Sequence, residues 1–87
     1  MTLLQLKEKL STHNVPDRWY SLDDGLKPDA CILYKNYLQW EFFYLNEKGD
    51  RHDYKFFDND EEAYDYLWKK IEYQLEFFKR SRGNDSH

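Results

Sequence analysis

The stretch Leu38-Gln39-Trp40-Glu41-Phe42-Phe43-Tyr44-Leu45 decides the fold that this chain can adopt. Side chains on a β-strand alternate between its two faces. One face of this stretch is wholly apolar and carries Leu38, Trp40, Phe42 and Tyr44. The other face is mixed and carries Gln39, Glu41, Phe43 and Leu45. This alternation is typical of a central antiparallel strand with one face in the core and the other partly solvated.

Short loops on both sides of this stretch predict two further strands. Residues 31–35 form the preceding strand, and Asn36-Tyr37 can serve as its two-residue hairpin loop. Glu47-Lys48-Gly49 can serve as a three-residue loop to the following strand. The expected cross-strand pairs are Leu33 with Trp40, Cys31 with Phe42, Tyr44 with His52, Phe42 with Tyr54, Trp40 with Phe56 and Glu41 with Lys55. Directly opposed residues share a face, so the core face should also contain Cys31, Leu33, His52, Tyr54 and Phe56.

A helix is expected at each end of the chain. Residues 2–13 repeat leucines at helical spacing, with Thr2 as the cap. Asp58 and Glu61 resemble a capping box at the start of a last helix that should run to about Arg80. Residues 19–22 can form a short edge strand or a loop. The sequence therefore predicts one α+β domain over residues 1–80, an antiparallel meander of three or four strands flanked by an N-terminal and a long C-terminal helix. Residues 81–87 should form a disordered tail.

The last helix carries two apolar stripes. The first should pack on the sheet and contains Tyr64, Leu67, Trp68, Ile71, Leu75 and Phe78. The second lies roughly 130° away and contains Ala63, Tyr66, Tyr73 and Phe77. Three alternatives could cover the second stripe: the first helix, a protein partner that uses its rings as anchors, or a second copy of the chain. The mixed face of the sheet is a further candidate surface, either partly covered by the first helix or free to bind.

Composition limits the classes of function. The chain has 87 residues, a net charge of −4 and 20% aromatic residues. The negative charge argues against a general nucleic-acid binder, which needs basic residues to replace phosphate counterions. Cys31 is the single cysteine, so an intrachain disulfide is impossible and a reducing compartment fits. We expect a cytoplasmic protein, because no signal-peptide pattern and no apolar run of ~18 residues is present.

No motif predicts catalysis. The glycines do not form a phosphate-binding loop, and the cysteine and histidines lack zinc-ligand spacing. Cys31 and His52 could pair as nucleophile and base, but the expected register buries Cys31. We therefore expect no enzymatic activity, no metal and no cofactor.

Several segments together resemble a known family. They are residues 13–22 (HNVPDRWYSL), 30–33 (ACIL), 40–49 (WEFFYLNEKG), 57–58 (FD) and 63–67 (AYDYL). Over about residues 1–80 the chain resembles the small immunity proteins of bacterial polymorphic toxin systems, including contact-dependent growth inhibition. The resemblance implies a cytoplasmic protein that binds and neutralises a cognate toxin domain. Such toxins are often nucleases with basic clefts. The resemblance carries over no catalytic or binding residues.

The residues proposed for partner binding therefore rest on the helix and sheet patterns. They are Glu62, Asp65, Tyr66, Lys69, Tyr73 and Phe77 of the last helix and Tyr34, Glu41 and Phe43 of the sheet. The expected partner is a basic toxin domain, with no direct nucleic-acid or membrane binding, and the free protein should be a monomer or a weak dimer. The alternative is a small adaptor or homodimeric module with no toxin partner.

Overall fold

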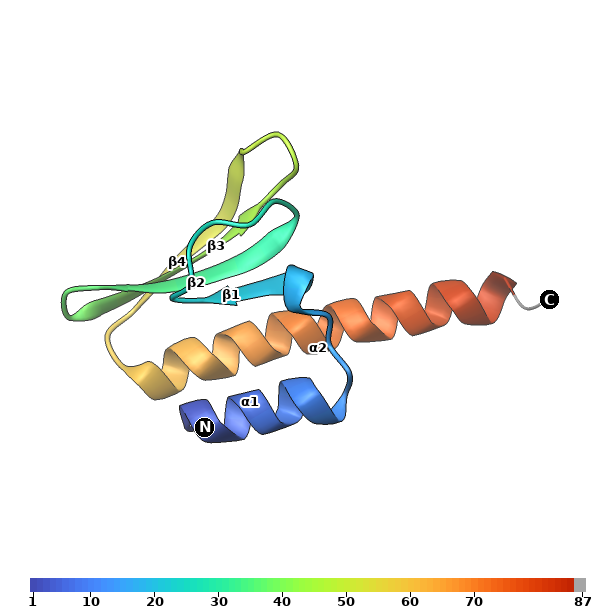
Figure 1. Cartoon of the computed structure of the whole chain (residues 1–87), viewed down its shortest axis with the longest axis horizontal. Helices are drawn as coiled ribbons and strands as arrows, with labels where there is room; N and C mark the ends of the chain where they lie inside the picture. The colour runs from blue at the N-terminus through green and yellow to red at the C-terminus, as the bar shows by residue number, and fades with distance from the viewer. Residues whose placement is uncertain (86–87) are drawn as a thin grey trace.

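The computed structural model describes residues 1–85, and the side chains of residues 1–79 (Figure 1). The elements are α1 (Leu3–Thr12), a 3-10 turn (Asp17–Trp19), β1 (Tyr20–Leu22), β2 (Ala30–Asn36), β3 (Gln39–Leu45), β4 (Arg51–Phe57) and α2 (Asp60–Asp85). The predicted α+β class, with an N-terminal helix and a long C-terminal helix, is confirmed.

The four strands form one sheet in the order β1-β2-β3-β4. β2, β3 and β4 are antiparallel neighbours as predicted. β1, however, runs parallel to β2, so the sheet is mixed and the expectation of a purely antiparallel meander was wrong. The reason lies in residues 23–29, which return the chain to the starting end of β1. Two hydrogen bonds hold this return: Ser21 Oγ donates to the Gly25 carbonyl at 2.7 Å, and the Asp23 N–H donates to the Leu33 carbonyl at 2.7 Å.

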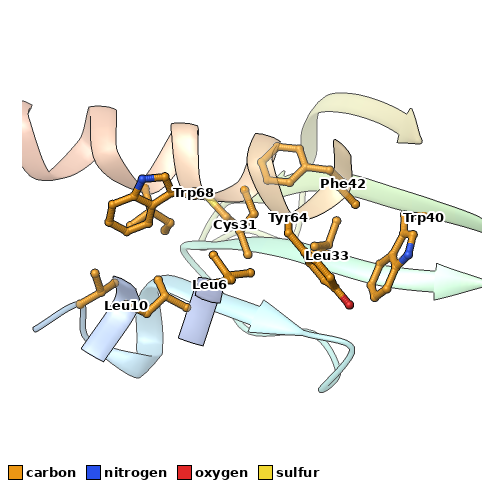
Figure 2. Packing of buried hydrophobic residues seen from close by; sticks show 12 residues of the cluster. Leu6, Leu10, Cys31, Leu33, Trp40, Phe42, Tyr64 and Trp68 are labelled. Atoms are coloured by element: carbon orange, nitrogen blue, oxygen red, sulfur yellow. The ribbon is translucent and has the colours of Figure 1, made fainter. Parts of the chain in front are cut away.

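Both helices lie on the same side of the sheet, with α1 alongside α2 (Figure 1). Their buried side chains meet those of the sheet in one cluster (Figure 2). The labelled members are Leu6 and Leu10 from α1, Tyr64 and Trp68 from α2, and Cys31, Leu33, Trp40 and Phe42 from the sheet. This cluster is the main core, and it forms because the apolar face of β3 meets the leucines of α1 and the first stripe of α2.

The start of each helix has a side-chain cap. Thr2 and Gln5 form a reciprocal capping box at α1, with N···O distances of 2.9 and 3.1 Å, which confirms Thr2 as the cap. At α2 the Asn59 side chain accepts a hydrogen bond from the Glu62 N–H at 2.8 Å. The predicted capping box of Asp58 and Glu61 was therefore wrong by one residue, because α2 begins at Asp60.

The end of α2 lies beyond the predicted one. We expected the helix to end near Arg80, and it continues to Asp85. The expected tail of residues 81–87 therefore overlaps the last part of α2, and its final two residues, 86 and 87, lie outside the described residues.

The loop of the β2–β3 hairpin lies one residue further along the chain than the sequence predicted, so the pairing register differs by two residues. Asn36 pairs with Gln39, so the loop is Tyr37-Leu38 and not Asn36-Tyr37. The pairs are now Leu33 with Phe42 and Cys31 with Tyr44. Each residue of β2 now pairs with a β3 residue two positions further along than predicted. Because side chains alternate with a period of two, every strand residue keeps its predicted face. The predicted burial of Cys31 and Leu33 is confirmed. Leu38, predicted in the core, instead lies in the turn and is exposed.

The β3–β4 hairpin contains a bulge. Tyr44 pairs with His52 as predicted, but Asp53 and Tyr54 then both lie opposite the single residue Phe43. Asp53 adopts a left-handed backbone with φ of 57°, which is the conformation that a bulge of this kind requires.

The bulge reverses the faces of the residues that follow it. Lys55, not Tyr54, lies opposite Phe42, and Phe57, not Phe56, lies opposite Trp40. The predicted pair of Glu41 with Lys55 is also wrong, because Glu41 faces Phe56. Phe57 therefore packs against the main core, whereas Tyr54 and Phe56 move to the outer face of the sheet, which carries no helix (Figure 1).

A second, smaller cluster lies on this outer face. It consists of Ala30, Ile32, Phe43 and Leu45, all buried, with Tyr34 packed against them. Phe43 is fully buried because the Arg51 guanidinium lies 4.7 Å from its ring centroid and the Tyr54 ring 5.1 Å from it. Side chains of the sheet thus cover Phe43 on this face, and α1 does not.

We predict that Tyr37→Gly stabilises the domain. Tyr37 has φ of 59°, a conformation that favours glycine and is an outlier for a bulky residue. Relief of this strain should raise the free energy of unfolding by up to about 1 kcal/mol. Leu38→Gly is the matched control: Leu38 has no positive φ, so the added flexibility should cost about 0.5–1 kcal/mol. Urea denaturation of both variants measures the difference, and equal effects would contradict the strain at Tyr37.

We predict that Phe43→Ala destabilises the domain by about 3–5 kcal/mol, since the ring is fully buried. Phe77→Ala is the matched control and should change the free energy of unfolding by less than about 0.5 kcal/mol, since most of that ring is exposed. Denaturant titration of the two variants shows whether the cluster around Phe43 on the outer face is a second core or only a surface patch. A tolerated Phe43→Ala would mean that the outer face has no core.

Candidate functional site

The second apolar stripe of α2 remains uncovered at two of its rings. Tyr73 is 73% exposed and Phe77 is 64% exposed. α1 packs elsewhere on α2, around Trp68: the His13 ring lies 5.0 Å from a Trp68 ring centroid and Lys9 Nζ lies 5.5 Å from it. Of the covers considered for this stripe, the first helix is therefore excluded for Tyr73 and Phe77.

A groove of about 410 Å³ lies beside these two rings, between α2 and the sheet. Its lining is formed by Cys31, Phe42, Tyr44, Asp53, Lys70, Tyr73, Gln74 and Phe77. The sheet supplies one wall, where the bulge places Asp53, and α2 supplies the other, where Lys70 stands among the rings. The groove is therefore mainly apolar, with one carboxylate and one ammonium group in its lining.

The thiol that lines this groove, that of Cys31, has low reactivity. Cys31 is buried, and its burial raises the pKa of the thiol to about 11, with Lys70 opposing the shift and Asp53 adding to it. The reactive form of cysteine is the thiolate, so a thiol with this pKa is almost wholly protonated near neutral pH. The geometry thus gives Cys31 a packing role.

The carboxylates at the start of α2 form an acidic end of the molecule. Glu62 and Asp65 are both exposed, and the Met1 amino group forms an ion pair with Asp65 at 2.8 Å. Asp60 is tied to the sheet: the Trp40 indole N–H donates to it at 2.6 Å, and Lys35 Nζ lies 3.6 Å away. These two contacts, chiefly the indole hydrogen bond, lower the pKa of the Asp60 carboxyl.

Two other predicted contact residues of α2 differ in their accessibility. Tyr66 is half-buried, with its ring 4.9 Å from that of Phe42 and 5.2 Å from that of Phe57. This residue of the second stripe therefore packs partly against the core and presents only part of its ring to solvent. Lys69 is exposed.

The outer face of the sheet brings together Tyr34, Glu41 and Phe43. A hydrogen bond between Tyr34 and Glu41, together with burial, raises the pKa of the Tyr34 hydroxyl. Phe43 is fully buried and so supports its neighbours without offering a contact surface. The exposed rings here are instead Tyr54 and Phe56, which stack with centroids 5.9 Å apart, and the Arg51 guanidinium donates to the Tyr54 hydroxyl at 2.9 Å.

The nine predicted contact residues therefore do not form one site. The six on α2 lie on the helix side of the sheet, and the other three lie on the opposite face. In the β2–β3 turn and in β4, sequence reasoning missed exposed large side chains, namely Tyr37, Leu38, Tyr54 and Phe56. Tyr54 and Phe56 in β4 are exposed because of the bulge, and the sequence has no glycine there that would predict a bulge. The two in the turn had a weak signal, because no Asn-Gly marked which residues form the loop.

Among the described residues, no group of three or more His, Cys, Asp or Glu side chains is placed to hold a metal ion. In the same part of the chain, none of the helices combines the length and the apolar character needed to span a bilayer. No protein-family model matches the chain, and the comparisons with curated proteins and with solved structures likewise found no match.

We predict that Cys31 resists thiol reagents in the folded protein. At pH 8, a pKa near 11 leaves on the order of 100-fold less thiolate than in an unfolded chain, and burial hinders access further. Ionisation favours the unfolded chain as pH rises, so the contribution of Cys31 to stability is complete below about pH 9 and declines from there to about pH 11. Labelling with an aromatic disulfide, with and without urea, measures this. Fast labelling of the folded protein would contradict it.

Proposed function

We propose that this protein is an immunity protein, which binds a cognate bacterial toxin domain and neutralises it by contact. The observation that carries the proposal is the exposure of Tyr73 and Phe77 beside an apolar groove on a long helix. Large rings on rigid elements are the usual anchors of tight protein interfaces. The resemblance of the sequence to immunity proteins supports a toxin domain as the partner, and the exposed rings beside the groove support binding through α2.

The charge of α2 favours a basic partner. Its exposed carboxylates include Asp60, Glu61, Glu62, Asp65, Glu72 and Glu76, whereas Lys69 and Lys79 are its exposed ammonium groups among the described side chains. Complementary charge speeds association and disfavours wrong partners. A nuclease toxin, whose cleft must be basic to hold phosphate, would be attracted to this surface. Inhibition of this kind requires coverage of the toxin and no catalytic group in the inhibitor.

A homodimeric module is the second candidate, and one feature of α2 favours it. Lys70 and Glu76 lie three residues before and three residues after Tyr73. In an antiparallel pair of α2 helices centred on Tyr73, Lys70 of each copy would lie opposite Glu76 of the other, with the rings between them. Light scattering over a range of concentrations separates the two candidates, because the immunity proposal expects a monomer or weak dimer when free.

The deciding experiment is calorimetry of this protein with the C-terminal domain encoded immediately upstream of it, at about 0.05 M and about 0.5 M salt. We expect nanomolar or tighter binding that weakens at the higher salt. Tyr73→Ala and Phe77→Ala should each weaken binding by roughly tenfold or more. In stopped-flow mixing of the same two proteins, Glu62→Lys with Asp65→Lys should slow association at low salt.

Leu4→Ala is the matched control, because Leu4 is an exposed apolar side chain on α1, away from the groove. It should leave the affinity unchanged. If the wild-type protein does not bind the upstream domain, the immunity proposal fails. Binding that ignores Tyr73 and Phe77 would move the interface away from α2.

A further inference from the structure

The turn between β2 and β3 carries the two most exposed large hydrophobic side chains of the described structure. Tyr37 is 93% exposed and Leu38 is 88% exposed. The hairpin projects at one end of the molecule, and these residues form its tip (Figure 1). Within the described chain, the Tyr37 side chain makes no hydrogen bond and no ring contact. Neither side chain therefore contributes to the core.

The backbone at the tip is strained as well as exposed. Among the non-glycine residues with positive φ, four are Asn or Asp, whose short side chains tolerate this region, and the fifth is Tyr37 at 59°. A glycine or an asparagine at position 37 would make the same turn at lower cost. The fold does not require this strain, because a less strained residue would make the same turn. Backbone strain of this kind at an exposed aromatic residue indicates a functional position.

The surroundings of the tip are acidic. Trp40 and Lys35, close to the tip on the two strands, both contact Asp60 at the start of α2. The hairpin tip and the start of α2 thus lie at the same end of the molecule (Figure 1). The exposed carboxylates at this end are Asp58, Asp60, Glu61 and Glu62. This end therefore combines two bare apolar side chains with a cluster of negative charge.

We propose that the Tyr37-Leu38 tip is an insertion element that enters an apolar pocket within a basic surface of the partner protein. The inference rests on the proposed function and deepens it, because it names the part of this chain that enters the toxin domain. The carboxylates at the start of α2 select a positively charged rim around that pocket. The same carboxylates repel the phosphates of nucleic acids and of anionic membranes, so a protein surface is the occupant that fits.

The tip would act as an anchor separate from the α2 rings. Glu62 and Phe77 are fifteen residues apart on one helix, which corresponds to ~22 Å. The acidic start of α2 lies at the tip end of this span, and Tyr73 and Phe77 lie toward the other. Substitutions at the two places therefore test two different contacts with the same partner.

The test is binding of the full chain to the C-terminal domain encoded immediately upstream, for the wild type and three tip variants. Tyr37→Gly and Leu38→Ala should each weaken binding at least about 30-fold, the size typical of an interface hot spot. Tyr37→Phe should bind within about threefold of the wild type, because it keeps the ring. Gln39→Ala is the control, since Gln39 is a polar, exposed residue of the same hairpin. This variant should bind the domain with the affinity of the wild type.

Stability measured on the same samples separates contact from folding. Tyr37→Gly should unfold at the same or a higher urea concentration while it loses affinity, which a merely structural role cannot produce. If the wild type binds and Tyr37→Gly binds equally well, the tip proposal is overturned and the immunity proposal stands. If the wild type does not bind, both are overturned. A concentration-dependent dimer of the free protein that Tyr37→Gly abolishes would also overturn the proposal, because the tip would then contact a second copy.

Discussion

The rest of this structure depends on one constraint: two successive phenylalanines of β3 are both buried, on opposite faces of the same sheet. Phe42 points toward the helices and Phe43 points away from them. A small domain normally has enough apolar surface for one core. Here α1 and α2 cover the Phe42 side, and the Phe43 side must be covered by the sheet itself. The bulge in β4 meets part of that need, because it turns Tyr54 toward Phe43. Arg51, which precedes the bulge, covers the same ring from its place opposite Leu45.

The features that followed from the sequence are those set by periodicity. Alternation over residues 39–45 identified β3, and the leucines of α1 and the first stripe of α2 gave the helices their inward faces. A register shift of two residues in the first hairpin kept all faces correct, because the side-chain period of a strand is two. The bulge did the opposite. One extra residue at Asp53 moved Tyr54 and Phe56 to the other face, and an aspartate in a strand gives no clear sign of this.

The candidate site was predictable to a similar extent. Helical geometry placed Tyr73 and Phe77 on one stripe, but only the packing of α1 around Trp68 establishes that this stripe is bare. Phe43 looked like a surface ring because the pattern cannot show what lies above a strand. The sequence pattern placed Tyr37 in the loop and Leu38 in the strand, because it favours the turn of lowest energy. The actual turn has Tyr37 in the left-handed conformation, which costs energy, so the pattern did not predict it.

The position of β4 at the edge of the sheet has a consequence for how the protein behaves in a crowded solution. An edge strand with a regular row of free N–H and C=O groups can template the addition of strands from other molecules, which leads to fibrils. Six of the seven residues of β4 are exposed, yet the bulge interrupts the spacing of its outward groups, and Arg51, Asp53 and Lys55 add charge along it. The opposite edge, β1, has only three residues. The device that buries Phe43 therefore also protects an aromatic-rich chain from polymerising.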